Sequence, residues 1–217
     1  VDGLSIIGTS AETYSSASPA QLEEAKTKLT NLIKNDFKGK VVFVIGENGL
    51  NLAKNCNVKF PIIKVGNWIG PLIVDAAIKN VKTVILFGYH GKLIKLAGGI
   101  FHTHNHLADG RIEILVYLAV KEKLPLEIIV KLSQLNNLED ALLFLEKFNQ
   151  SIADKLFKNL SNTIERRSIS YVNRYIKTDM EIAAIIFDRK RKIRWSGIKG
   201  NDYICLLYTS DAADDDH

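Results

Sequence analysis

The sequence predicts an α/β fold, in which a mainly parallel sheet covered by helices is followed by a helical segment and a C-terminal β-hairpin. Two observations lead to this fold class. Short apolar runs rich in β-branched residues occur at residues 41–45, 62–65 and 81–87, and amphipathic helical patterns separate them. This alternation is typical of a parallel sheet. Each run is followed by a glycine, at Gly46, Gly66 and Gly88, so the three loops are expected to line one crevice at the carboxyl edge.

The other elements follow from periodicity and capping signals. Residues 5–8 form a short apolar run that ends at a glycine turn, and a helix opens at Ser18-Pro19, since proline suits the first helical turn. Further helices are expected from residue 110, with Asp109 as N-cap, then over residues 124–132 and 137–148, with Asn137 as N-cap, and from residue 152 toward residue 162. Residues 182–187 and 193–195 read as a hairpin around residues 188–192.

This order predicts a division of the chain into three parts. Residues 1–122 form an α/β domain with Gly-rich site loops, and residues 123–204 form a helical segment plus a hairpin packed on it. Residues 205–217 resemble the translation of a sequencing adapter and are expected to be a non-native read-through tail. Leaving out the tail reduces Asp and Glu from 24 to 20 against 29 Lys and Arg, so the formal net charge rises from +5 to +9.

Composition limits the function classes. The chain has 217 residues, 47% of them hydrophobic, which is enough for a substantial core. No apolar run approaches the roughly 20 residues of a membrane helix. Two cysteines give neither a disulfide framework nor a zinc spacing, so we expect a cytoplasmic protein with no membrane partner. The basic balance suits an anionic ligand.

The densest group of polar and glycine residues lies in residues 87–111, directly after the third apolar run. Glycines let a backbone approach a ligand, and lysines with free N–H groups attract anions. We therefore expect a loop-rich ligand site here. Lys92 and Lys95 are three residues apart and would share a face of a helix, where they could bind carboxylates or simply be solvated.

Two other patterns carry weaker signals. His102, His104 and His106, with Asp109, could converge on a transition metal, but they match no closed zinc spacing, and substrate binding or helix capping explains them as well. The basic run at residues 189–192 could bind nucleic acid. It falls at an expected hairpin tip, where charges normally solvate a turn, so we expect no nucleic-acid partner.

Residues 87–111 resemble a long motif of the cobalt-precorrin-5B C1-methyltransferase family, CbiD. The motif is Gly-His-x-Gly-Lys-Leu-x-Lys-Leu-Ala-Gly-Gly, then Ile, a Thr-His pair and Ala-Asp. The matching positions are Gly88, Gly91, Lys92, Leu93, Lys95, Leu96, Ala97, Gly98, Gly99, Ile100, Thr103, His104, Ala108 and Asp109. The segments at residues 66–70 and 8–10 are similar to two further family segments. The resemblance spans residues 6–195, and it implies that the chain is the C-terminal portion of a longer enzyme. It does not imply that this portion is active by itself.

The resemblance implies methylation of a cobalt-containing tetrapyrrole at C1 in anaerobic cobalamin biosynthesis, with S-adenosylmethionine as methyl donor. It implies His104 and Asp109 as catalytic residues, and a set of substrate- or cofactor-binding residues that comprises Gly66, Asn67, Gly70, Gly88, His90, Gly91, Lys92, Lys95, Gly98, Gly99 and Thr103. Many relatives lack histidine at positions 102 and 106, so no metal site is expected. The alternatives are a non-catalytic anion-binding module and a histidine-based metal-dependent hydrolase.

Overall fold

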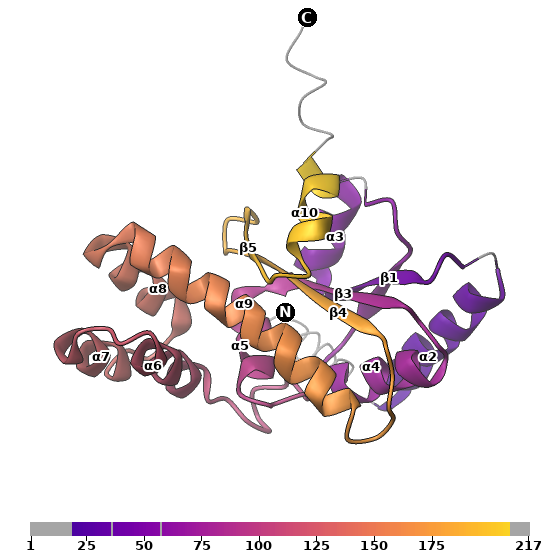
Figure 1. The fold of residues 1–217 in the computed structure, drawn as a ribbon, viewed down its shortest axis with the longest axis horizontal. Helices are drawn as coiled ribbons and strands as arrows, with labels where there is room; N and C mark the ends of the chain where they lie inside the picture. The colour runs from indigo at the N-terminus through magenta and orange to yellow at the C-terminus, as the bar shows by residue number, and fades with distance from the viewer. Residues whose placement is uncertain (1–18, 36, 57, 209–217) are drawn as a thin grey trace, which may run out of the picture.

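The computed structural model describes residues 19–35, 37–56 and 58–208 (Figure 1). The apolar run at residues 5–8 and the turn at residues 8–10 lie outside the described residues. The expected tail begins at position 205, inside the last described helix, α10 (Asn201–Tyr208), and residues 209–217 are not described. Among the described residues, no helix is both long and apolar enough to cross a bilayer.

The strands of the described residues form one sheet in the order β2-β1-β3-β4-β5. Their bounds are β1 (Lys40–Ile45), β2 (Ile62–Val65), β3 (Thr83–Tyr89), β4 (Glu181–Phe187) and β5 (Ile193–Ser196). The first four run parallel, and β5 returns antiparallel to β4. The predictions of a mainly parallel sheet, of three neighbouring parallel strands and of a C-terminal antiparallel strand pair are therefore confirmed.

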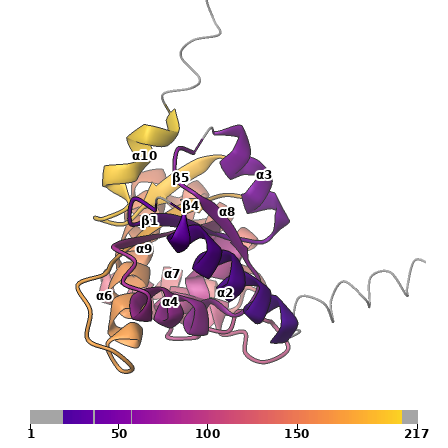
Figure 2. The same cartoon turned by 90° about the vertical axis from the view of Figure 1, so that its right-hand side faces the viewer.

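Helices cover both faces of the sheet (Figures 1 and 2). One face carries α2 (Pro19–Lys34), α4 (Ile69–Ile78), α5 (His90–Ala97) and α9 (Gln150–Val172). The other face carries α3 (Glu47–Asn55) and α10. Both faces of the central strands are buried, which explains why their sequences are continuous apolar runs rather than alternating ones.

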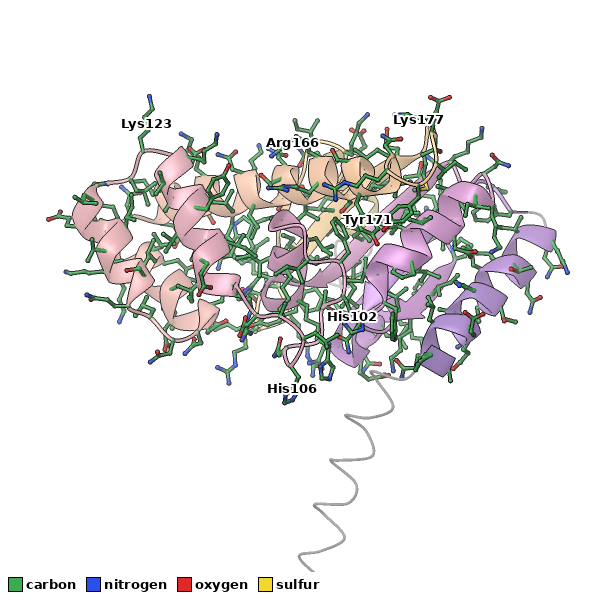
Figure 3. The ribbon with its side chains drawn as sticks, turned by 90° about the horizontal axis from the view of Figure 1, so that it is seen from below. His102, His106, Lys123, Arg166, Tyr171 and Lys177 are labelled. Atoms are coloured by element: carbon green, nitrogen blue, oxygen red, sulfur yellow. The ribbon has the colours of Figure 1, made fainter. Side chains whose placement is uncertain are left out.

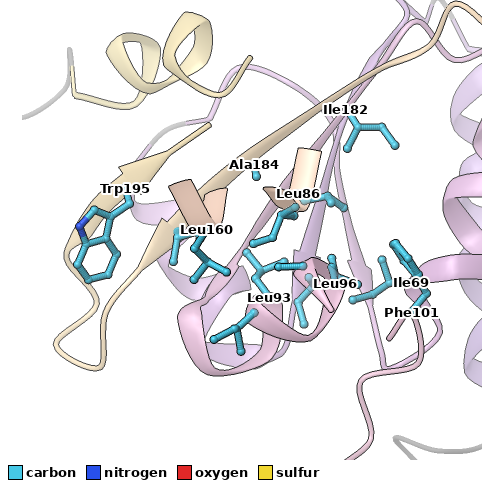
Figure 4. Packing of buried hydrophobic residues seen from close by; sticks show 14 of the residues in the cluster. Ile69, Leu86, Leu93, Leu96, Phe101, Leu160, Ile182, Ala184 and Trp195 are labelled. Atoms are coloured by element: carbon cyan, nitrogen blue, oxygen red, sulfur yellow. The ribbon is translucent and has the colours of Figure 1, made fainter. Parts of the chain in front are cut away.

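Successive residues of each strand contribute to the two hydrophobic layers in turn. Val84 and Leu86 of β3 pack with the larger cluster, and Ile85 and Phe87 pack with the smaller one. Figure 4 shows Leu86 beside Ala184 of β4, its partner in the strand register, within the larger layer. The sheet is thus held between two cores, and its carboxyl edge has a fixed position relative to the helices.

The segment between β3 and β4 adds α6 (Arg111–Lys121), α7 (Leu126–Ser133) and α8 (Leu138–Phe148), which lie beyond one end of the sheet (Figure 1). Asn137 caps α8 as predicted, since its Oδ1 accepts a hydrogen bond from Asp140 N at 2.9 Å. The expected cap at Asp109 is wrong: Gly110, with φ of 68°, directly precedes α6 and provides no side-chain cap. The domain boundary expected at residue 122 falls between α6 and α7. Strands from before this residue, β1 to β3, and from after it, β4 and β5, belong to the same sheet.

Helix α9 continues ten residues past the expected end at residue 162. Its buried stripe includes the polar side chains of Glu165 and Ser168, and these hide the apolar periodicity from sequence inspection. Glu165 accepts hydrogen bonds from the backbone N–H groups of Ala184, Lys199 and Gly200 at 2.8–3.0 Å. The carboxylate thereby fixes α9 to β4 and to the start of α10.

Candidate functional site

A cleft of about 330 Å³ lies at the carboxyl edge of the sheet. It sits over β1 and β3, where the chain leaves β1 toward β2 on one side and leaves β3 toward β4 on the other. Such switch points are the usual ligand positions in open α/β sheets. We call it the switch-point cleft, and its lining comprises Ile45, Gly46, Glu47, Asn48, Tyr89, Lys92, Phe187, Asp188, Arg189 and Arg191.

Lys92 is the predicted site residue that reaches this cleft. It is the third residue of α5, a helix within the segment of residues 87–111 that was expected to be rich in loops. A Cβ atom at Gly46 would lie 3.9 Å from Lys92 Nζ, so the ammonium faces the loop after β1. The Lys92 side chain is exposed at the cleft, and its partial desolvation there, together with the charge of Lys64, lowers the pKa of Lys92. A cation at the positive end of a helix is also unfavourable, and a bound anion would offset both effects.

Tyr89 forms another wall of the cleft and is tied to the helical segment by Glu139 of α8. Tyr89 Oη donates to Glu139 Oε2 at 3.2 Å, and His90 Nε2 lies 3.1 Å from the same oxygen. Burial and the negative charge of Glu139 raise the pKa of Tyr89 to about 12, so the phenol stays protonated to well above neutral pH. Glu139 was not predicted from the sequence.

His90, one of the predicted ligand-binding residues, is fully buried behind Tyr89. Its ring packs edge-on against Phe157 and Trp195. Burial lowers the pKa of His90, although Glu139 acts in the opposite direction. His90 Nδ1 is buried and has no hydrogen-bond partner among the described residues. The neutral tautomer with Nε2–H donating to Glu139 fits this environment, and the ring does not line the cleft.

The third wall comes from the turn between β4 and β5, which the sequence suggested was a solvated hairpin tip. Because β4 runs parallel to β3, this turn ends at the carboxyl edge, and Arg189 and Arg191 line the cleft. Arg191 Nη2 donates to Asn48 Oδ1 of α3 at 3.1 Å, so the turn reaches across to the loop after β1. Sequence inspection found the basic run but not its position.

Lys95 has a different environment from Lys92. It is fully buried, and its ammonium donates to Thr103 O at 3.2 Å, Asn105 Oδ1 at 2.7 Å and Ala108 O at 2.6 Å. An ammonium has three protons, so these acceptors can engage all of them. We therefore assign Lys95 to holding the loop between α5 and α6 rather than to holding a ligand carboxylate.

The predicted glycines of this segment serve close packing and helix termination. A Cβ at Gly91 would lie 2.5 Å from the Tyr89 ring, and one at Gly98 would lie 2.4 Å from Ile114 of α6. Gly99, with φ of 82°, ends α5 while Gly99 N and Ile100 N bond back to Leu96 O and Lys95 O at 3.0 Å. Gly88 lies within β3, between Ile45 and Leu93. None of these four lines the switch-point cleft.

The structure brings the two other predicted segments together, at residues 66–70 and 101–103. Thr103 Oγ1 donates to Asn67 Oδ1 at 3.0 Å, Thr103 N donates to Asn67 O at 3.0 Å, and both residues are buried. Gly70 N donates to Phe101 O at 3.0 Å, and a Cβ at Gly70 would lie 2.8 Å from Phe101 Cβ. Gly66 is half-buried at the end of β2. These contacts set the path of the loop beside α4. Gly46 lines the switch-point cleft, whereas Gly66 does not.

The predicted catalytic residues His104 and Asp109 lie on the same loop. Asp109 forms a bidentate ion pair with Arg111, at 2.5 and 2.8 Å, and this lowers the pKa of Asp109. A carboxylate with a lowered pKa is a weaker proton acceptor. His104 is half-buried, and its carbonyl accepts hydrogen bonds from Leu107 N and Ala108 N. Within the described residues, neither side chain hydrogen-bonds to the cleft lining.

His102 and His106 lie on the lower surface of the molecule on this loop (Figure 3). The ring centroids of His102 and His104 are 6.4 Å apart, those of His104 and His106 are 5.1 Å apart, and His102 packs edge-on against Trp68 at 4.4 Å. In the part of the chain that the structure describes, no group of three or more His, Cys, Asp or Glu could hold a metal ion.

Comparison with known proteins gives a consistent result. Residues 102–197 match the family model described as the CbiD C-terminal domain. The chain is 84% identical over 204 residues to the cobalt-precorrin-5B C(1)-methyltransferase of Prochlorococcus marinus strain MIT 9312, an alignment that covers 94% of this chain and 55% of the relative. The corresponding protein of strain NATL1A is 51% identical over 202 residues, covering 92% of this chain and 53% of the relative.

No solved structure matches the chain. The chain spans about half the length of the curated relatives it matches. An identity of 84% that extends over nearly the whole chain requires common descent and a common fold, and the motif at residues 88–109 lies beside the cleft where such a fold binds ligands. The chain therefore carries a match to the CbiD C-terminal domain over residues 102–197, and nearly all of it is homologous to part of the cobalt-precorrin-5B C(1)-methyltransferases named above.

Proposed function

We propose that the protein of which this chain is a part transfers a methyl group to C1 of cobalt-precorrin-5B in anaerobic cobalamin biosynthesis, with S-adenosylmethionine as donor. The observation that carries the proposal is that two independent features, the family motif and the cleft at the switch point, share the same residue. The family motif at residues 88–109 supplies Lys92, and Lys92 lines the cleft at the topological switch point. The relatives are named for this reaction.

The cleft suits a small ligand that is both polar and partly apolar. Its volume of about 330 Å³ lies at the lower end of small-molecule pockets. Ile45, Tyr89 and Phe187 provide apolar and aromatic surface, and Lys92 provides a positive charge. A nucleoside joined to an amino acid fits this combination, whereas a tetrapyrrole macrocycle is larger than the cleft and would lie across its mouth.

When bound, the donor supplies an electrophilic methyl group on its sulfonium, so the protein needs to orient the reactants and exclude water more than it needs a strong base. Lys92 would hold a carboxylate. Tyr89, kept protonated and fixed by Glu139, would keep its ring and hydroxyl in place beside the ligand. The loop held by Lys95, with His104 and Asp109, would contact the substrate outside the cleft.

The test is methyl transfer by the full-length parent protein from donor labelled in its methyl group to cobalt-precorrin-5B under anaerobic conditions. We expect one labelled methyl per substrate, at C1. The matched variants are Lys92→Ala and Lys59→Ala, the latter a lysine on the segment before β2 that does not line the cleft. A parent that binds the tetrapyrrole and transfers no methyl would instead indicate the anion-binding module.

A further inference from the structure

The arginines and the lysines of the turn at residues 188–192 line two different cavities. Arg189 and Arg191 line the switch-point cleft. Lys190 and Lys192 line a separate polar cavity of about 1000 Å³ between α9, β5 and α10. The two residue types differ in chemistry: a guanidinium binds a carboxylate through two parallel hydrogen bonds, and an ammonium acts as a point charge. The cleft therefore receives the two side chains suited to recognising a carboxylate in one orientation.

The turn is held in shape by Asp188. Asp188 Oδ1 accepts from Lys192 N, Asp188 O accepts from Arg191 N, and Asp188 N donates to Lys192 O, each at 3.0 Å. Arg191 is held at φ of 63°, a conformation that is rare for a residue with a side chain. A disfavoured conformation maintained by several hydrogen bonds is common at ligand sites. Here it accompanies a guanidinium that reaches Asn48 across the cleft.

The acidic residues of the cleft wall already have cationic partners. Glu47 pairs with Lys64, and Asp188 Oδ2 lies 3.7 Å from Arg194 Nη1 while Asp188 Oδ1 accepts from the backbone. Within the described residues, neither Arg189 nor Arg191 forms an ion pair with a carboxylate, and nor does Lys92. Three positive charges from two elements thus line one cleft, and none of them is paired with the two carboxylates that line it, Glu47 and Asp188.

We propose that Arg189 and Arg191 form a carboxylate-binding element of the switch-point cleft, acting together with Lys92. The inference rests on the proposed function for the identity of the ligand. In that reaction a carboxylate has two sources, the amino-acid group of the methyl donor and the acetate or propionate arms of the tetrapyrrole. The recognition chemistry is the same for both.

The experiment measures binding to the 217-residue chain by calorimetry with two probes. S-adenosylhomocysteine represents the donor, and uroporphyrin III represents the acidic tetrapyrrole. The carboxamide of S-adenosylhomocysteine is a ligand control that lacks the negative charge. The variants are Arg189→Ala, Arg191→Lys and Arg191→Gly, since glycine suits φ of 63° without the side chain. Lys190→Ala and Lys192→Ala remove the same charge from the opposite side of the turn, and thermal melting checks folding.

We expect Arg189→Ala and Arg191→Gly to weaken binding of at least one carboxylate probe by about 10-fold or more. Arg191→Lys should also weaken binding of the carboxylate probe, because the lysine keeps the positive charge but cannot form two parallel hydrogen bonds. The two lysine variants should change the affinity less than about threefold, and the carboxamide should be insensitive to every variant. Sensitivity of one probe alone identifies its carboxylate as the one bound.

Three results would overturn the proposal: equal losses in arginine and lysine variants, unchanged affinity in the arginine variants, or no binding of either probe to the unsubstituted chain at millimolar concentration. The proposed function is tested separately in the parent. If the parent with Arg191→Gly transfers methyl with unchanged KM for both substrates, the turn has no binding role and the function stands. If the unsubstituted parent transfers no methyl, the function fails whatever the binding data show.

Discussion

Glu139 Oε2 accepts a hydrogen bond from Tyr89 Oη at 3.2 Å, although α8 and the end of β3 are 50 residues apart in the chain. The same oxygen lies 3.1 Å from His90 Nε2. One carboxylate of the helical segment thus fixes both a cleft residue and the buried ring behind it. The helical segment therefore contributes to the geometry of the cleft without lining it.

Replacing Glu139 by Ala should lower the free energy of unfolding by about 1–3 kcal/mol, because the N–H of the buried His90 ring loses its acceptor. Urea unfolding of the two proteins measures the difference. Glu127→Ala, an exposed glutamate in the first turn of α7, is the matched control and should change stability by less than about 0.5 kcal/mol. Equal stability of Glu139→Ala and the unsubstituted chain would remove Glu139 from this role.

Stability should fall as the pH falls below about 6.5. Burial lowers the pKa of His90 in the folded protein, so the unfolded chain takes up a proton at a higher pH than the folded chain does. The contribution of neutral His90 is present above the unfolded pKa and is lost as the pH decreases through the folded pKa. Urea midpoints between about pH 7.5 and about pH 5.5 measure this loss. The same series on His90→Gln should be flatter, and parallel slopes would contradict the assignment to His90.

Lys95→Met should destabilise the protein by roughly 1.5–3 kcal/mol, because two backbone carbonyls and Asn105 lose a charged donor in a buried position. Amide hydrogen exchange in residues 103–108 should accelerate in the variant. Lys92→Met, on the same helix but facing the cleft, provides the control and should retain the unfolding free energy within about 0.5 kcal/mol. The hypothesis fails if the two variants lose stability equally.

Lys92→Ala should weaken binding of a carboxylate ligand by about 10- to 150-fold in the parent protein, and by less if the ammonium remains screened by water. The ligand should also be bound with proton uptake at alkaline pH, since an anion beside Lys92 raises a pKa that partial desolvation and Lys64 had lowered. Calorimetry in buffers of different ionisation enthalpy measures that uptake. Unchanged affinity and proton uptake in Lys92→Ala would exclude Lys92 from the ligand site.

Deleting residues 209–217 should leave the thermal midpoint unchanged. Deletion from residue 205 onward should lower it, because the second cut removes half of α10 (Asn201–Tyr208). The helical turn that holds Tyr203 edge-on against Phe60, at 5.9 Å, then loses the rest of its helix. Differential scanning calorimetry of the two truncations distinguishes them. Equal midpoints would mean that the last turn of α10 adds no stability, as the adapter-like sequence suggested.

The fold was predictable from local patterns, and the site only in part. The β-branched runs and their glycines predicted β1, β2, β3 and the parallel sheet. The position of β4 beside β3 depends on packing between segments that are distant in the sequence, and this position carries Arg189 and Arg191 to the cleft. A signal was present, since residues 182–187 are apolar without alternation, as expected for a strand buried on both faces.

Lys92 and Lys95 illustrate a second limit. Their spacing of three predicted a shared helix face, but the face of α5 that holds Lys95 is covered by the loop that follows the helix. The apolar residues around Lys95, from Leu93 to Ala97, indicated burial, and the family motif drew attention to both lysines equally. Which lysine meets solvent is decided by the loop's path, and that path depends on contacts such as Thr103 with Asn67.

The placement of the helical segment between two adjacent parallel strands also affects how the chain is made. Thr83 of β3 pairs with Glu181 of β4, and 98 positions separate them. At synthesis rates of about 5–20 residues per second, about 5–20 s pass between the synthesis of β3 and the synthesis of its partner strand β4. For that interval an apolar strand with an unpaired edge is exposed to other chains. Slower translation of residues 90–180 should therefore increase aggregation during synthesis while leaving the finished protein unchanged.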